Sequence, residues 1–138
     1  MSKHILLLII ELLSLLLISC GRSGQQAALL AAAKDSYTQI SQDKAKEMMS
    51  RDDGHIVVDV RRPDEFSEGH IPGAICIPNE SITDSQPAEL PDLDQVILIY
   101  CRSGRRSKEA SQKLFDMGYT NVYEFGGIID WTGEITTP

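Results

Sequence analysis

The stretch that most constrains the fold is VILIY at residues 96–100, a run of five apolar residues. A run with no polar alternation is typical of a strand that is buried on both faces. Strands of that kind lie in parallel sheets that helices cover on both sides, so the chain must alternate strands with crossover helices. Cys101 follows the run directly, and the next six residues contain three arginines, a glycine and two serines.

The rest of the chain supplies the required alternation. Short β-branched or apolar runs predict three further strands, at 55–60, 74–77 and 121–125. Helices are predicted at 41–49, from Pro63 onward and at 107–117, with a final helical turn after Gly126 and Gly127. Right-handed crossovers between such elements give a mainly parallel sheet flanked by helices on both faces. The fold class is therefore α/β, with the folded domain at 39–138.

The N-terminal segment has a different character. Lys3 precedes a mostly apolar run at 5–18, which is shorter than the roughly 20 residues that a membrane-spanning helix needs. We interpret residues 1–19 as a signal peptide and residues 20–38 as a tether. The ending LISCG resembles the lipobox of bacterial lipoproteins, which implies lipidation of Cys20 and an anchor at the cell envelope, outside the cytoplasm. An ordinary secretory signal and an uncleaved anchor are the alternatives.

The charge of the chain limits its partners. The net charge is −7, and an acidic protein lacks the basic footprint that a nucleic acid requires. We therefore predict no nucleic-acid partner. The cluster of Arg102, Arg105 and Arg106 is conspicuous against this acidic background.

The cysteines and histidines do not indicate a metal site. The three cysteines include no C-x-x-C pair, and the three histidines are not spaced with them as zinc ligands. If Cys20 carries lipid, Cys76 and Cys101 remain as thiols. An envelope location would permit a disulfide between these two, a question that spacing alone leaves open.

Cys101 is placed where α/β proteins carry out chemistry. In open parallel sheets, ligands bind at the carboxyl ends of strands, next to helix N-termini. The loop CRSGRR turns from the strand toward the next helix, and Gly104 permits the positive φ that such a turn often needs. Amide donors, the helix dipole and the arginines would all favour a thiolate at Cys101. The alternative is a small buried thiol beside a solvated turn, but that leaves three arginines unexplained.

Three segments resemble the single-domain rhodaneses, the sulfurtransferase family: DVRRPDEFSEGHIPGAICIP, IYCRSGRRS and GYTNVYEFGGIIDW. The resemblance runs from about Ile40 to the C-terminus. It implies a catalytic Cys101 that takes a sulfane sulfur from an anionic donor such as thiosulfate and passes it, as a persulfide, to cyanide or a thiol. It implies no cofactor and no metal. The substrate-binding loop would consist of Arg102, Ser103, Gly104, Arg105 and Arg106.

Other residues match the family in supporting positions. Asp59 and Arg61 match a D-x-R motif, and we expect them to brace the domain by ion pairing. His70, in GHIPGA, is expected to hold a turn, with a general base as the alternative. Cys76 lies between two isoleucines and is expected to be a packed thiol rather than one that resolves oxidised Cys101.

Two other functions use the same residues. Related folds bind phosphate with a Cys-x5-Arg loop, as in cysteine-dependent phosphatases and arsenate reductases. Here Ser107 occupies the place of that arginine, and Arg106 comes one residue early. The other alternative is a rhodanese-like persulfide carrier or binding module that serves a protein partner; the presence of Cys101 argues against an inert module.

Overall fold

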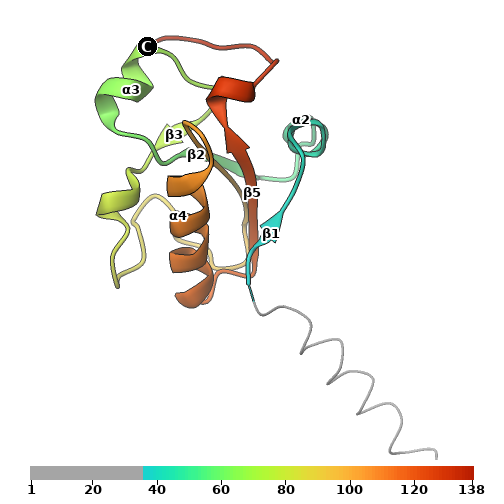
Figure 1. The fold of residues 1–138 in the computed structure, drawn as a ribbon. Coiled ribbons are helices and arrows are strands. Elements are labelled where there is room, and N and C mark those ends of the chain that lie inside the picture. The colour runs from blue at the N-terminus through green and yellow to red at the C-terminus, as the bar shows by residue number, and fades with distance from the viewer. Residues whose placement is uncertain (1–35) are drawn as a thin grey trace, which may run out of the picture. The chain divides into compact units, whose positions relative to one another are not determined.

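A computed structural model describes residues 36–138, which form a five-stranded parallel sheet with helices on both faces (Figure 1). The strands run in the order β1-β5-β4-β2-β3, and every neighbouring pair is parallel. Their bounds are β1 Thr38–Gln39, β2 Ile56–Asp59, β3 Ile75–Cys76, β4 Val96–Cys101 and β5 Asn121–Gly127. The predicted α/β class is confirmed, and the sheet is parallel throughout.

Within residues 36–138, three α-helices and one 3-10 turn lie between the strands, and a second 3-10 turn follows β5. The α-helices are α2 Gln42–Met49, α3 Pro63–Glu68 and α4 Arg105–Asp116, and the turns are η1 Asn79–Ser81 and η2 Ile128–Asp130. The Ser41 side chain accepts a hydrogen bond from the Lys44 N–H at 3.1 Å, which caps α2 as predicted. In the part of the chain that the structure describes, no helix has the length and apolarity to cross a membrane.

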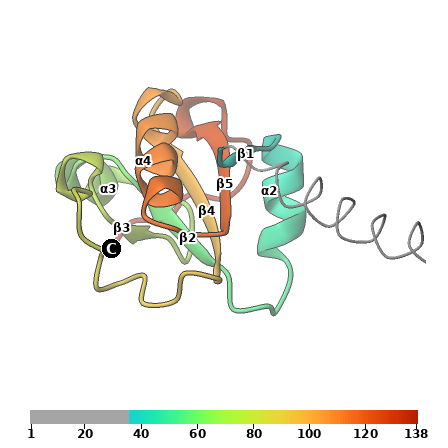
Figure 2. The ribbon, with the colours of Figure 1, turned by 90° about the horizontal axis from the view of Figure 1, so that it is seen from below.

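The central strand β4 explains how the layers are held together. Ile97, Ile99 and Cys101 point into a core shared with α4, while Leu98 and Tyr100 point into a core shared with α2. Figure 2 shows α4 and α2 on opposite sides of the sheet. Because both faces of β4 are covered, its uninterrupted apolar sequence is what the fold requires.

The structure corrects several predicted boundaries. β1 was not predicted, and its Thr38 lies inside the segment interpreted as a tether although it pairs with Tyr123 of β5. α4 begins at Arg105 rather than Ser107, because Gly104 turns the chain with φ +104°. β5 continues two residues beyond the predicted end at Phe125. The signal-peptide and lipidation predictions, including Cys20, concern residues outside 36–138.

Candidate active site

Cys101 ends β4 and lies at the base of the loop that leads into α4. The residue is 1% exposed, and its sulfur accepts a hydrogen bond from the Gly104 N–H at 3.0 Å. The positive φ predicted for Gly104 is confirmed, and this conformation aims its N–H at the sulfur. The helix that starts at Arg105 adds the positive end of its dipole. The loop therefore provides a site for negative charge on sulfur.

A second hydrogen-bond partner of the sulfur comes from the first turn of α4. The Cys101 Sγ lies 3.4 Å from Ser107 Oγ, to which a thiol can donate. Ser107 Oγ in turn lies 2.6 Å from Oε1 of Glu124, a carboxylate on β5 that is 3% exposed. Both Ser107 and Glu124 were missed in the sequence as site residues. Strand alternation could have indicated Glu124, since it shares a strand face with the buried Val122.

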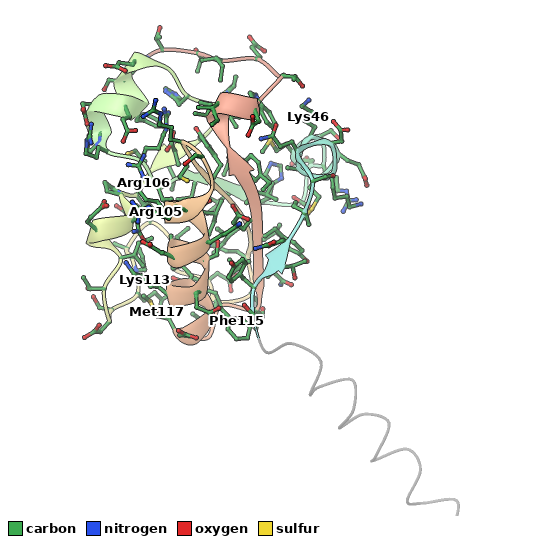
Figure 3. The ribbon with its side chains drawn as sticks, viewed as in Figure 1. Lys46, Arg105, Arg106, Lys113, Phe115 and Met117 are labelled. Atoms are coloured by element: carbon green, nitrogen blue, oxygen red, sulfur yellow. The ribbon has the colours of Figure 1, made fainter. Side chains whose placement is uncertain are left out.

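Arg106, which was expected to belong to the substrate-binding loop, forms an ion pair with a distant helix. Its guanidinium binds both oxygens of Glu65 in α3, at 2.7 and 2.9 Å, and the two side chains are 14% and 16% exposed. The hydrogen bond from Arg106 lowers the pKa of Glu65 to about 2. The pair ties α3 to the first turn of α4, which follows the Cys101 loop, and Figure 3 labels Arg106 on the side of α4 toward α3. The sequence could not reveal this contact, because the partners lie 41 positions apart.

The other two arginines are placed differently. Arg105 pairs with Glu109 at 2.9 Å and is largely exposed. The Arg102 side chain makes no hydrogen bond or ion pair with any described residue. It lines a pocket of about 370 Å³ beside the loop, together with Arg62, Glu65, Glu80, Ser103, Arg105 and Arg106. Arg102 is thus the loop guanidinium that is free to bind an anion.

Asp59 and Arg61 form a buried ion pair behind the site. The Arg61 side chain donates to both Asp59 oxygens and, through Nη2, to the Gly69 carbonyl at 2.7 Å. Burial alone would lower the pKa of Arg61. The hydrogen bonds and the charge of Asp59 have a larger, opposite effect, so the pKa of Arg61 lies above its usual value. Asp59 is in register with Tyr100, so it faces away from Cys101. This geometry fits the predicted bracing role.

Cys76 is separated from Cys101. Register pairs Cys76 with Asp59, which places its side chain on the sheet face opposite that of Cys101. β2 also lies between the two strands, so their Cα atoms are separated by two strand spacings, roughly 9.5 Å. A disulfide needs less than about 7 Å. Both thiols are free, and burial raises the pKa of Cys76.

His70 holds a turn, as predicted. Its ring stacks on Phe66 with centroids 3.7 Å apart, and Nδ1 lies 3.0 Å from the Phe66 carbonyl oxygen. Its backbone pairs with Thr136 near the C-terminus. Among residues 36–138, no three His, Cys, Asp or Glu side chains are grouped as metal ligands.

These features define an α/β protein with a cysteine at the carboxyl end of a central strand, in a loop that gives its sulfur a backbone N–H donor. Comparison with known proteins identifies the family: residues 41–134 match the model of the rhodanese-like domain. The chain belongs to the rhodanese-like family.

Named relatives agree with this assignment. The chain is 37% identical over 73 residues to thiosulfate sulfurtransferase PspE of Escherichia coli, covering 53% of this chain and 70% of PspE. It is 33% identical over 93 residues to thiosulfate sulfurtransferase GlpE of Pseudomonas aeruginosa, covering 67% of this chain and 81% of GlpE. A solved structure described as a rhodanese with anions from E. coli superposes with a TM-score of 0.56 at 32% identity, covering 61% of this chain and 99% of that one.

Proposed function

We propose that the protein is a sulfurtransferase that moves a sulfane sulfur from an anionic donor such as thiosulfate to cyanide or a thiol, through a persulfide on Cys101. The observation that carries this proposal is the hydrogen bond from the Gly104 N–H to the Cys101 sulfur at 3.0 Å. That donor stabilises a thiolate before reaction and an anionic persulfide after it. The names of the relatives PspE and GlpE support the same reaction.

The reaction is covalent catalysis in two steps. The Cys101 thiolate attacks the outer sulfur of thiosulfate, the sulfur–sulfur bond of the donor breaks, and sulfite leaves with the bonding electron pair. The persulfide then remains in the loop. Cyanide or an acceptor thiolate attacks its outer sulfur, and the electron pair of the broken bond returns to Cys101.

Intact-mass measurement tests the first step. Incubation of the reduced protein with thiosulfate is expected to add the mass of one sulfur atom, and cyanide is expected to remove it. The modified residue should map to Cys101 rather than Cys76, because only Cys101 has the loop around it. A folded, reduced protein that gains no sulfur would contradict the proposal and favour a binding module.

Substitution of Arg102 is expected to affect substrate binding, whereas substitution of Arg106 is expected to affect stability. Arg102→Ala is expected to raise the KM for thiosulfate about tenfold, the effect of one lost charge-assisted contact, and to leave unfolding nearly unchanged. Arg106→Ala leaves Glu65 with the Arg62 N–H, at 3.1 Å, as its remaining hydrogen-bond donor, and is expected to cost about 1–3 kcal/mol of stability. Steady-state kinetics and thermal unfolding of both variants give the comparison.

The pH dependence provides the control. A carboxyl whose pKa is lowered on folding contributes stability at pH values above its unfolded pKa, and the contribution disappears as pH falls through the folded pKa. The Arg106→Ala deficit should therefore be complete above about pH 4.5 and shrink toward pH 2. A stability deficit of Arg106→Ala that is constant over this pH range would contradict the Glu65 explanation. Separately, an unchanged KM for thiosulfate in Arg102→Ala would exclude Arg102 from donor binding.

The geometry gives less support to the other functions. In a phosphatase or arsenate reductase the residue at position 107 would be an arginine, whereas Ser107 here is hydrogen-bonded to the buried Glu124, so the loop lacks the guanidinium that would bind a phosphate. A persulfide carrier for a protein acceptor uses the same loop and first step. It differs in the second step, so a carrier would load sulfur but turn over slowly with cyanide and low-mass thiols.

We also propose, from residues 17–21 of the sequence, that Cys20 is lipidated and holds the protein at the bacterial cell envelope. Cys20→Ser is expected to abolish incorporation of a labelled fatty acid and to release the protein from the membrane fraction. Label retained in that variant would contradict the proposal.

A further inference from the structure

Three polar groups form a chain behind the catalytic loop. Cys101 Sγ lies 3.4 Å from Ser107 Oγ, and Ser107 Oγ lies 2.6 Å from Glu124 Oε1. All three residues are at most 3% exposed. The mechanism above uses Cys101 and leaves a buried carboxylate, connected to its sulfur through one hydroxyl, without a role.

Ser107 has one hydrogen and several acceptors for it. These are Glu124 Oε1 at 2.6 Å, the Gly104 carbonyl at 3.0 Å and the Gly126 carbonyl at 3.4 Å. The contact with Glu124 has the length of a hydrogen bond between a hydroxyl and an ionised carboxylate. When Glu124 is ionised, Ser107 therefore presents a lone pair to the sulfur and can accept a hydrogen from a thiol. It can donate to a thiolate when its hydrogen turns from Glu124 to the sulfur.

Glu124 also reaches a second pocket. This pocket, of about 360 Å³, is lined by Glu124 and by residues that include Gln42, Lys108 and Asp130. The arginine pocket described above shares only Ser103 with it. The two pockets therefore lie on different sides of the catalytic loop. Glu124 connects the chain of hydrogen bonds to the second pocket, whose lining contains no arginine.

We propose that Cys101 and Glu124 share one proton through Ser107, with Glu124 as a positioning residue. As the S–H bond breaks, its proton moves to Ser107 Oγ, and the Ser107 proton moves to Glu124 Oε1. The electron pair of the S–H bond stays on sulfur as the nucleophile. Glu124 releases the proton to water in the second pocket, and the reverse steps restore the thiol. The proton thus leaves on one side of the loop while an anionic donor arrives on the other.

Other charged groups face this chain. The guanidinium groups of Arg102, Arg105 and Arg106 lie on the donor side, with Glu65 held by Arg106. Lys108 and Asp130 line the second pocket with Glu124. None of them joins the hydrogen-bond chain from Cys101 to Glu124, so none adds a second proton site to it.

The inference rests on the proposed role of Cys101 as the nucleophile, and a titration tests it without any sulfur donor. The thiolate has an ultraviolet absorbance, which is taken as the difference between the protein and its Cys101→Ala variant across pH. Two sites that share a proton titrate in two macroscopic steps, so the wild-type curve is expected to show both. Glu124→Gln, which cannot take the proton, should lose one step and follow a one-proton curve.

The Ser107 variants test the connection itself. Ser107→Ala removes the hydroxyl and should also give a one-proton curve, whereas Ser107→Thr keeps a hydroxyl and should keep both steps. This pair does not depend on whether Glu124→Gln folds. Glu109→Gln is the matched control, because Glu109 is a carboxylate on α4 that bonds to Arg105 and Asn79 and not to Ser107. It should retain two steps.

A one-proton wild-type curve would overturn the proposal. A Glu124→Gln curve that is displaced along the pH axis with both steps retained would also overturn it, because that result shows a charge effect with no shared proton. Failure of the sulfurtransferase function is a separate result: it appears as absence of sulfur loading in the mass measurement, whatever the shape of the titration.

Discussion

Cys101→Ala is expected to lose sulfur transfer by a factor on the order of a thousand or more, because no other group in the loop can form the persulfide. Stability should fall by only about 1–2 kcal/mol. The substitution removes one buried atom from the core on the α4 face and leaves the Gly104 N–H without its acceptor. Turnover of thiosulfate with cyanide, measured beside thermal unfolding, separates the two effects.

Cys76→Ala is the matched control for this prediction. It deletes the same atom from the opposite face of the sheet, where the sulfur contacts the Arg61 carbonyl. Its activity should equal that of the wild type, and Cys101→Ser should be as inactive as Cys101→Ala while offering an acceptor to Gly104. Comparable losses in the Cys76 and Cys101 variants would mean that both act through stability, which would contradict the assigned nucleophile.

Four of the five strands could be predicted from the sequence, because the pattern of apolar residues along a strand indicates which of its faces are buried. β4 must be apolar at every position, since alternate residues enter different cores, and the sequence at 96–100 meets that demand. β1 was missed because Thr38–Gln39 is too short to show any period. The start of α4 was predicted two residues late, because the turn at Gly104 already begins the helix there.

The candidate site could be predicted only in part, because some of its contacts join residues that are far apart in the sequence. The motif located Cys101 and its loop, and Gly104 could be assigned its positive φ from its residue type. The ion pair of Arg106 could not be predicted from the motif, because its partner, Glu65, belongs to a distant helix. Glu124 was overlooked because a glutamate on a strand is usually solvent-facing. Local sequence shows which groups are available, and long-range packing decides which of them meet.

Gly127→Ala is expected to cause the second large loss of stability and activity, because Gly127 packs directly against the backbone of the catalytic loop. A Cβ at Gly127 would overlap the Arg102 carbonyl oxygen and lie 2.6 Å from the Ser103 Cα, both backbone atoms. Gly127 has an extended backbone, φ −124°, that alanine also adopts, so the entire cost comes from contact. Since the flanking Arg102 carbonyl also accepts from the Ile129 N–H at 3.2 Å, the loop cannot move away freely.

The expected loss for Gly127→Ala is about 3 kcal/mol of stability, from overpacking against backbone, together with reduced transfer because the displaced segment follows Cys101 directly. Gly73→Ala is the contrasting control. Gly73 has φ +80°, and a Cβ added there would have no atom within 4 Å, so its cost is backbone strain alone, about 1 kcal/mol, with activity retained. Denaturant unfolding and turnover of both variants decide the matter. If Gly127→Ala were as stable and active as Gly73→Ala, close approach of β5 to the loop would not be what shapes the site.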